Sequence, residues 1–339
     1  MIYVFTFLGE FGYELLNWQG VIRKFSQTLG PHGRIVCCSR ANLYPLYETA
    51  SLYIDISEVE LFKNSQASCY FALLPGSSNQ CSEDNVAFDK RLKSSLRSFI
   101  ADRLPRNNGR WLPWFNKEKT VLVFSSDKVQ INGCTFGCDR NLFDNEGTIY
   151  DRLELSNNVY GRIEPDLTVR GEIERRIGFD LSEPYILVQG RTREIGTRST
   201  DVIPKERLIE VLAENGKVVL LSFTTGRKLD SYSRFDTSIK CHHFSCRSFV
   251  EQACLVHFAR SCLFFTEGDF GSHMYVPPFM GKDVVAIAPR SVYELETTPI
   301  SFWNRNVFSF GGRIIPKISE EIFANRQSLV EVVDEVLSR

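Results

Sequence analysis

The chain has no excess of charge of either sign. It contains 40 Lys and Arg residues against 41 Asp and Glu residues, a formal net charge of −1. A protein that binds nucleic acid through the phosphate backbone carries a basic excess or stripe. The balance therefore gives no support for general nucleic-acid binding and leaves room only for a local basic pocket.

Long apolar runs are also missing. None approaches the roughly 20 residues that span a bilayer. The apolar start at residues 1–8 follows no basic region and precedes no small-residue cleavage site, so it predicts a first β-strand rather than a signal peptide. These absences favour a cytoplasmic protein with no transmembrane segment, and they remain compatible with peripheral membrane contact.

Three familiar motifs are absent. The chain has no GxGxxG fingerprint, no Walker A loop and no pair of CxxC motifs. Its ten cysteines are scattered, and two groups depart from the usual zinc spacing: Cys134-x3-Cys138 and Cys241-His242-His243-x2-Cys246. Reduced thiols in a cytosolic fold are the preferred interpretation, and neither a metal nor a cofactor is expected.

What is present is an alternation of strand and helix patterns in two series. A strand at 2–8, a helix at 13–29 and a strand at 34–38 predict a parallel sheet with a right-handed crossover. Two later strands are expected at 70–74 and 120–124. The second series contains, in order, strand 185–188, helix 204–215, strand 217–223, helix 249–259, strands 262–265 and 283–288, and a terminal helix 319–337.

A length of 339 residues favours two domains. The predicted fold class is α/β, with two Rossmann-like domains facing across a cleft. We expect an N-terminal domain over 1–165, a connecting helix and linker over 166–184, and a C-terminal domain over 185–339.

The loop after the first strand is the first candidate site. Open α/β sheets bind ligands beyond the carboxyl ends of their strands, and Gly9, Glu10 and Gly12 lie at such an end. A desolvated loop carboxylate has a raised pKa and suits a general base, so Glu10 is the catalytic candidate. The alternative is that Gly9 and Gly12 serve the turn and Glu14 is a helix-start residue favoured by the dipole.

The loop after the strand at 185–188 is the second candidate. Three arginines fall within eight residues there, and guanidinium forks match phosphate oxygens. Hydroxyl groups at the end of the next strand are expected at the same site. The residues assigned to ligand binding are Gln189, Gly190, Arg191, Arg193, Arg198, Ser222 and Thr224. The alternative is a solvated basic loop.

The third candidate follows the apolar run at 262–265. A glycine-containing turn and a short helix come next, and unpaired N–H groups at a helix start favour anions. A carboxylate of Glu267 or Asp269 is expected to bind ribose or sugar hydroxyls, while Gly271 and Ser272 are expected to hold a phosphate. His273 is either a ligand contact or a structural histidine.

The layout resembles the GT-B architecture of sugar-nucleotide glycosyltransferases. The segment Glu267-Gly268-Asp269-x2-Ser272-His273, followed by Pro277 and Gly281, looks like the donor-binding turn of that superfamily. The arginine loop is similar to diphosphate-contacting loops of its fucosyltransferase-like and heptosyltransferase-like members, and the Gly9–Gly12 loop resembles the first loop of fucosyltransferase-like enzymes. The chain has no Asp-x-Asp triplet, which argues against the metal-dependent GT-A class, and it lacks the Glu-x7-Glu pattern of many retaining members.

The resemblance implies an inverting, metal-independent glycosyltransferase. It would move a sugar from a nucleotide-sugar donor, bound by the second half, to a hydroxyl of a glycan or glycoconjugate acceptor, bound by the first. Two alternatives stay open: a sugar-nucleotide epimerase of GT-B-like fold, and a non-catalytic binding or scaffold protein with degenerate halves.

Overall fold

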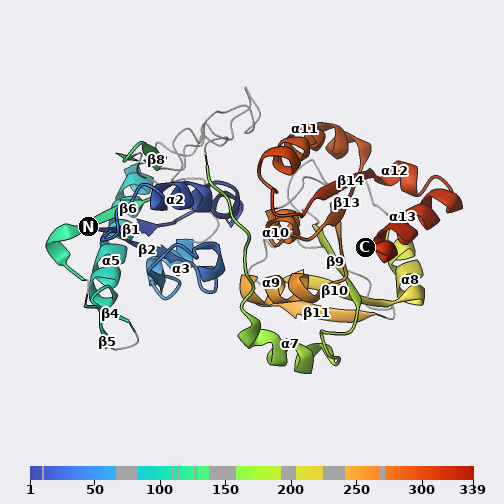
Figure 1. Cartoon of the computed structure of the whole chain (residues 1–339), viewed down its shortest axis with the longest axis horizontal. Coiled ribbons are helices and arrows are strands. Elements are labelled where there is room, and N and C mark those ends of the chain that lie inside the picture. The colour runs from blue at the N-terminus through green and yellow to red at the C-terminus, as the bar shows by residue number, and fades with distance from the viewer. Residues whose placement is uncertain are drawn as a thin grey trace. The chain divides into compact units, whose positions relative to one another are not determined.

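The computed structural model describes residues 1–9, 11–65, 83–107, 110–113, 115–125, 127, 129–136, 158–191, 204–223, 241–266 and 272–339. The chain divides into two compact units, a first unit Met1–Tyr160 and a second unit Gly161–Arg339. Each contains a parallel β-sheet with helices (Figure 1). The predicted α/β class with two Rossmann-like halves is confirmed.

The first sheet, in the first unit, has four parallel strands in the order β3-β2-β1-β6. They are β1 (Ile2–Thr6), β2 (Arg34–Ser39), β3 (Leu52–Asp55) and β6 (Thr120–Phe124). Thr6 is in register with both Cys38 and Phe124, so β1, β2 and β6 end together. We call this side the carboxyl edge of the first sheet, and the Gly9 loop leaves from it.

The structure describes further elements of the first unit. They are α1 (Phe11–Tyr13), a π-helical turn (Glu14–Trp18), α2 (Gln19–Ser26), a 3-10 turn (Tyr44–Leu46), α3 (Glu60–Ser65), α5 (Glu83–Arg103), a 3-10 turn (Lys117–Lys119) and the hairpin strands β4 (Arg106–Asn107), β5 (Arg110–Trp111), β7 (Val129–Ile131) and β8 (Cys134–Phe136). The predicted first helix therefore runs from Phe11 to Ser26. The strand predicted at 70–74 lies outside the described residues.

Both faces of the first sheet are buried. Val4 and Val36 belong to a core that also holds Leu92 and Leu96 of α5. On the other face Phe5 stacks on Phe136, with ring centroids 4.5 Å apart. This two-sided burial explains why β1 and β2 are almost continuously apolar, as parallel strands usually are.

The second sheet, in the second unit, has six parallel strands in the order β11-β10-β9-β12-β13-β14. They are β9 (Tyr185–Arg191), β10 (Lys217–Phe223), β11 (His242–Cys246), β12 (Ser261–Thr266), β13 (Val284–Ala288) and β14 (Ile314–Ile318). The two outer strands, β11 and β14, were not predicted. Both are partly exposed, and β14 contains Pro316, a residue that sheets tolerate at an edge.

The helices in the described part of the second unit are a 3-10 turn (Leu167–Val169), α7 (Arg170–Ile177), α8 (Lys205–Asn215), α9 (Phe249–Phe258), a 3-10 turn (Ser272–Tyr275), α10 (Val276–Phe279), α11 (Arg290–Asn306), α12 (Ser319–Ile322) and α13 (Arg326–Ser338). The predicted terminal helix is thus two helices. Asn325 starts the second one, because its side chain accepts a hydrogen bond from the backbone N–H of Ser328 at 2.9 Å.

Alternation along β9 decides what each face of the second sheet contacts. Ile186 and Val188 share a core with α8 and α13. Tyr185 points to the other face, where its hydroxyl donates to the carbonyl of Leu255 in α9 at 2.5 Å. Since side chains alternate along a strand, Gln189 also lies on the α9 face. No helix in the described part of the chain is long and apolar enough to cross a bilayer.

Candidate functional site

At the carboxyl edge of the first sheet lies a buried carboxylate. Glu14 sits in the π-helical turn with its side chain fully buried, and the Tyr47 hydroxyl donates to its Oε1. Arg40 Nη1 lies 3.5 Å from its Oε2. Burial raises the pKa of Glu14, while the positive charge of Arg40 acts in the opposite direction. Glu14 is therefore a buried carboxylate that contacts Tyr47 and Arg40. The alternative interpretation of the sequence, in which Glu14 is a helix-start residue favoured by the helix dipole, did not anticipate this burial.

Arg40 links this carboxylate to the Gly9 loop. It directly follows β2, and its Nη2 donates to the backbone carbonyl of Gly9. Its side chain is 22% exposed, and its guanidinium lies 5.6 Å from the centre of the Phe62 ring. Arg40 thus fixes the residue immediately before Glu10. Glu10 itself is outside the described residues, and Gly12 lies in α1.

The π-helical turn that carries Glu14 is held by a later segment of the same unit. The hydroxyl of Tyr160 donates to the carbonyl of Leu16 at 2.6 Å. A Cβ atom added to Gly20 would lie 2.8 Å from the Tyr160 ring, so only glycine allows this close approach. Single π turns occur often at functional sites, and this one turns the Glu14 carboxylate inward.

Aromatic rings lie next to these charges. Tyr47 stacks on Tyr53 with centroids 5.9 Å apart, and Tyr44 meets Tyr53 edge-on at 6.1 Å. Tyr53 donates its hydroxyl proton to the carbonyl of Arg40. Tyr44 is exposed. The carboxyl edge of the first sheet therefore combines a fixed cation, a buried carboxylate and an exposed aromatic ring.

In the second unit, the register of two strands brings two predicted loops together. Gly190 pairs with Phe265, and Arg191 pairs with Thr266. The chain therefore leaves β9 and β12 at neighbouring points, which we call the carboxyl edge of the second sheet. The side chain of Arg191 is not described, and Arg193, Arg198, Thr224, Glu267, Asp269 and Gly271 lie outside the described residues.

Three polar side chains form a hydrogen-bonded relay at this edge. Gln252 Nε2 in α9 donates to Gln189 Oε1 at 3.2 Å. The other atom of that amide, Gln252 Oε1, lies 2.8 Å from His273 Nδ1. Gln189 is 4% exposed and Gln252 is fully buried. The structure thus brings Gln189 and His273, two of the residues assigned to ligand binding, together through Gln252 of α9.

The two predicted serines have different surroundings. Ser272 begins the 3-10 turn that contains His273, so it lies beside the relay. Ser222 is the second-last residue of β10, in register with Ser245, and its hydroxyl lies 3.5 Å from the carbonyl of Phe244. The hydroxyl of Ser222 thus contacts the outer strand β11.

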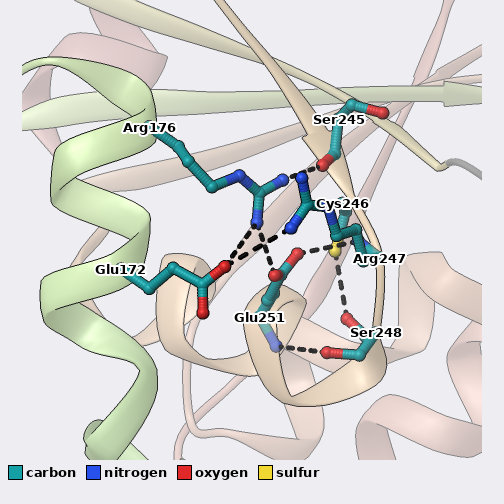
Figure 2. Close-up of polar contacts among 7 residues, drawn as sticks. All are labelled: Glu172, Arg176, Ser245, Cys246, Arg247, Ser248 and Glu251. Carbon is teal, nitrogen blue, oxygen red and sulfur yellow. Dashed lines mark hydrogen bonds and ion pairs between the residues drawn. The ribbon is translucent and has the colours of Figure 1, made fainter.

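Helix α9, which carries the relay, is anchored at its N-terminus by ionic and capping contacts (Figure 2). Glu251 Oε1 lies 2.5 Å from Arg176 Nη1 of α7, and Glu251 Oε2 accepts from the backbone N–H of Arg247 at 2.7 Å. Ser248 accepts from the backbone N–H of Glu251 at 3.2 Å. These contacts determine where Gln252, the next residue, meets the second sheet.

Of the suspected zinc residues, Cys134 lies in β8, and the group from Cys241 to Cys246 lies in β11 and immediately before it. His242 Nδ1 lies 3.2 Å from the carbonyl of Ile177, and Cys246 donates its thiol proton to the carbonyl of Ser248 at 3.0 Å. Cys241 Sγ lies 3.6 Å from His243 Nε2. Across the residues that the structure describes, no three His, Cys, Asp or Glu side chains form a possible metal site. Cys138 lies outside them.

Sequence reasoning missed Arg40, Tyr47 and Gln252. Arg40 could have been chosen, because it lies two residues after the strand predicted at 34–38, near the kind of strand end that supplied the other candidates. Tyr47 and Gln252 carry no such signal. Their role comes from packing between elements that are distant in the sequence.

Comparison with known proteins gives likenesses in structure only. No protein-family model matches the chain, and no curated protein matches it in sequence. A glycosyl transferase of family 9 from Veillonella parvula has a TM-score of 0.47 at 12% identity, over 97% of both chains. ADP-heptose LPS heptosyltransferase II from E. coli has a TM-score of 0.48 at 14% identity, over 99% of this chain and 97% of that chain.

A UDP-GlcNAc 2-epimerase from Methanocaldococcus jannaschii has a TM-score of 0.39 at 11% identity, over 100% of this chain and 93% of that chain. The first two likenesses are to the class of enzyme that the sequence resembles, and the third is to its first alternative. At these identities and TM-scores they assign neither an activity nor a substrate to this chain.

Proposed function

We propose that the protein is a glycosyltransferase that moves a sugar from a nucleotide-sugar donor to a hydroxyl of a glycan or glycoconjugate acceptor. The observation that carries this proposal is the β9–β12 register. It makes the arginine loop and the turn before His273 leave the second sheet at neighbouring points. The donor is then bound at the carboxyl edge of the second sheet, and the acceptor by the first unit.

The donor site is proposed to consist of cations and hydrogen-bond donors. Arg191, Arg193 and Arg198 would bind the diphosphate, because guanidinium groups pair bidentately with phosphate oxygens. Ser222, Thr224 and Ser272 would add hydroxyl contacts, and Gly271 would allow close backbone approach. Glu267 or Asp269 would accept hydrogen bonds from ribose or sugar hydroxyls.

The acceptor side is proposed to supply the base. Glu10 would remove the proton of the acceptor hydroxyl, whose oxygen then attacks the anomeric carbon as the nucleoside diphosphate leaves. Arg40 holds the carbonyl of Gly9, so it would position the Glu10 loop. Glu14 would hold Arg40 in turn. The leaving charge would be stabilised by the arginines without a metal.

The proposed inverting chemistry needs no cofactor. We further propose a cytoplasmic location, with any membrane contact peripheral and made through the acceptor.

The proposal is tested in two steps. Thermal shift against a panel of nucleotides and sugar nucleotides selects the donor, since a ligand that binds the native state raises the melting temperature. The selected sugar nucleotide, radiolabelled in the sugar, is then incubated with candidate acceptors and the products are identified. A labelled glycan supports the proposal. An isomerised sugar nucleotide would indicate an epimerase, and binding without turnover a non-catalytic protein.

A further inference from the structure

Tyr44 is an aromatic residue that the fold leaves exposed. Its neighbours Leu43, Leu46 and Tyr47 are buried, whereas Tyr44 is 37% exposed. One exposed apolar side chain needs no explanation by itself. Tyr44 differs because it lies in the loop that follows β2 at the carboxyl edge of the first sheet, where open α/β sheets place ligands.

The loop that carries Tyr44 is fixed on both sides of the ring, and by the same buried carboxylate. Before the ring, Arg40 Nη1 lies 3.5 Å from Glu14 Oε2. After it, Tyr47 donates its hydroxyl proton to Glu14 Oε1. A ring held in this way loses little conformational freedom when a ligand covers it, so more of the contact energy appears as affinity.

A second aromatic ring connects Tyr44 to the loop of the proposed base. Tyr53 of β3 meets the Tyr44 ring edge-on, with centroids 6.1 Å apart. The hydroxyl of Tyr53 donates to the carbonyl of Arg40, and Arg40 donates to the carbonyl of Gly9. The exposed ring therefore belongs to the same connected group of contacts as the loop from which the proposed base acts on the acceptor.

We propose that Tyr44 binds the acceptor by stacking its exposed ring on the C–H face of a sugar ring. A pyranose carries hydroxyl groups around its rim and C–H groups on its faces, and these C–H groups suit the negative face of an aromatic ring. Dispersion adds to the attraction across the whole contact. The proposal rests on the proposed function, because it makes a sugar ring the part of the acceptor that the first unit recognises.

The test compares three variants of Tyr44 in steady-state kinetics with the acceptor that product analysis identifies. Tyr44→Ala removes the ring and should raise the KM for the acceptor by about 2- to 12-fold, the range for an aromatic contact. Binding lost equally from ground and transition states leaves kcat unchanged, and the KM for the donor should not change. Tyr44→Phe keeps the ring and should match the wild type. Tyr44→Leu is apolar but has no aromatic face, so it should resemble Tyr44→Ala.

The matched control is Val330→Ala. It truncates a side chain of α13 that is exposed to a similar degree, 39%, and it should leave both KM values unchanged. Urea unfolding confirms that each variant is folded, and if Tyr44→Ala is not, Tyr44→Leu takes its place. An unchanged acceptor KM in the folded variant overturns the proposal. A weakened affinity for the nucleoside diphosphate, measured by calorimetry, also overturns it, because the ring would then stack on the nucleobase.

A binding measurement separates this proposal from the proposed function. If no acceptor is glycosylated, the proposed function fails, and saturation-transfer NMR with a panel of methyl hexopyranosides then decides the role of Tyr44 without donor or turnover. We expect saturation of the ring C–H protons of at least one sugar by the wild type and by Tyr44→Phe, and its loss with Tyr44→Ala. No saturation by the wild type, or equal saturation by Tyr44→Ala, overturns the sugar-binding role.

Discussion

The two carboxyl edges are built from different chemistry. The edge of the first sheet is ionic: a fully buried carboxylate, Glu14, lies 3.5 Å from the Arg40 guanidinium, and Arg40 also holds Gly9. The edge of the second sheet is neutral where it is described, with two buried amides in series behind His273. An ionic pair fixes the position of a loop, whereas the two amides join a strand, a helix and a turn.

The two edges also differ in the free energy that is lost when one partner of a contact is removed. A buried charge that loses its partner is strongly destabilising, because its desolvation is no longer compensated. A neutral amide that loses one hydrogen bond costs less. Variants at the first edge should therefore change folding and turnover, while variants at the second edge should mainly change ligand affinity.

The largest expected effect is on turnover. Glu10→Gln keeps the size of the side chain but removes the base, and a general base contributes about 10²–10⁴-fold. We expect kcat to fall by that range with little change in donor affinity, measured by steady-state kinetics and calorimetry. Glu58→Gln, which changes an exposed carboxylate on the surface, is the control. Near-normal turnover in Glu10→Gln would exclude it as the base.

The next effect is on stability. Glu14→Ala leaves Arg40 and Tyr47 without their buried acceptor, and breaking a buried ion pair costs about 3–5 kcal/mol. Because the Arg40 side chain is 22% exposed, we expect about 3 kcal/mol, the lower end of that range, measured by urea unfolding. Glu58→Ala breaks an exposed pair with Arg103 and should cost less than about 1 kcal/mol. Equal losses in the two variants would contradict the contrast between buried and exposed pairs.

At the second edge the arginines should control affinity. Arg191→Ala and Arg193→Ala should each weaken nucleoside diphosphate binding by about 1–3 kcal/mol, the range for charge-assisted hydrogen bonds. Arg260→Ala is the control, because Arg260 precedes β12 at the opposite end of the strand. Calorimetry that finds the same affinity in a folded Arg191→Ala, Arg193→Ala double variant would remove both residues from the site.

The smallest effect is a pH dependence. The pKa of Glu14 is raised above its ordinary value of 4.5, so between that value and the raised one the native state binds more protons than the unfolded state. This group therefore lowers the free energy of unfolding as pH rises through that window. Glu14→Gln has no carboxyl group at this position, so its free energy of unfolding lacks this dependence on pH. Unfolding measured from about pH 4 to about pH 8 should show the wild type losing stability relative to Glu14→Gln. A constant or increasing difference would contradict the raised pKa.

Much of the fold was predictable, because the central strands are buried on both faces and read as continuous apolar runs. β10 has the predicted bounds, Lys217–Phe223. The outer strands β11 and β14 were not predicted, because an edge strand carries polar or exposed residues among the apolar ones. The glycine and arginine loops were chosen from their position after strands, and their role in ligand binding stays a prediction.

Three residues show this limit in physical terms. Glu14 and Arg40 meet because β1 and β2 end at the same edge, which register decides and spacing along the chain does not. Gln252 is polar in an apolar helix, and periodicity places such a residue toward solvent. Helix α9 is instead packed between the second sheet and α7. Its polar residues therefore form hydrogen bonds and ion pairs with buried groups.

Hydrogen–deuterium exchange with and without the selected sugar nucleotide tests the central assignment most directly, because it locates the donor on the chain. We predict protection of backbone amides at the ends of β9 and β12 and in the 3-10 turn Ser272–Tyr275, with no comparable change in the Met1–Tyr160 unit. Protection confined to the Met1–Tyr160 unit, or absent from β9, β12 and that turn while the ligand is bound, would contradict a donor site at the carboxyl edge of the second sheet.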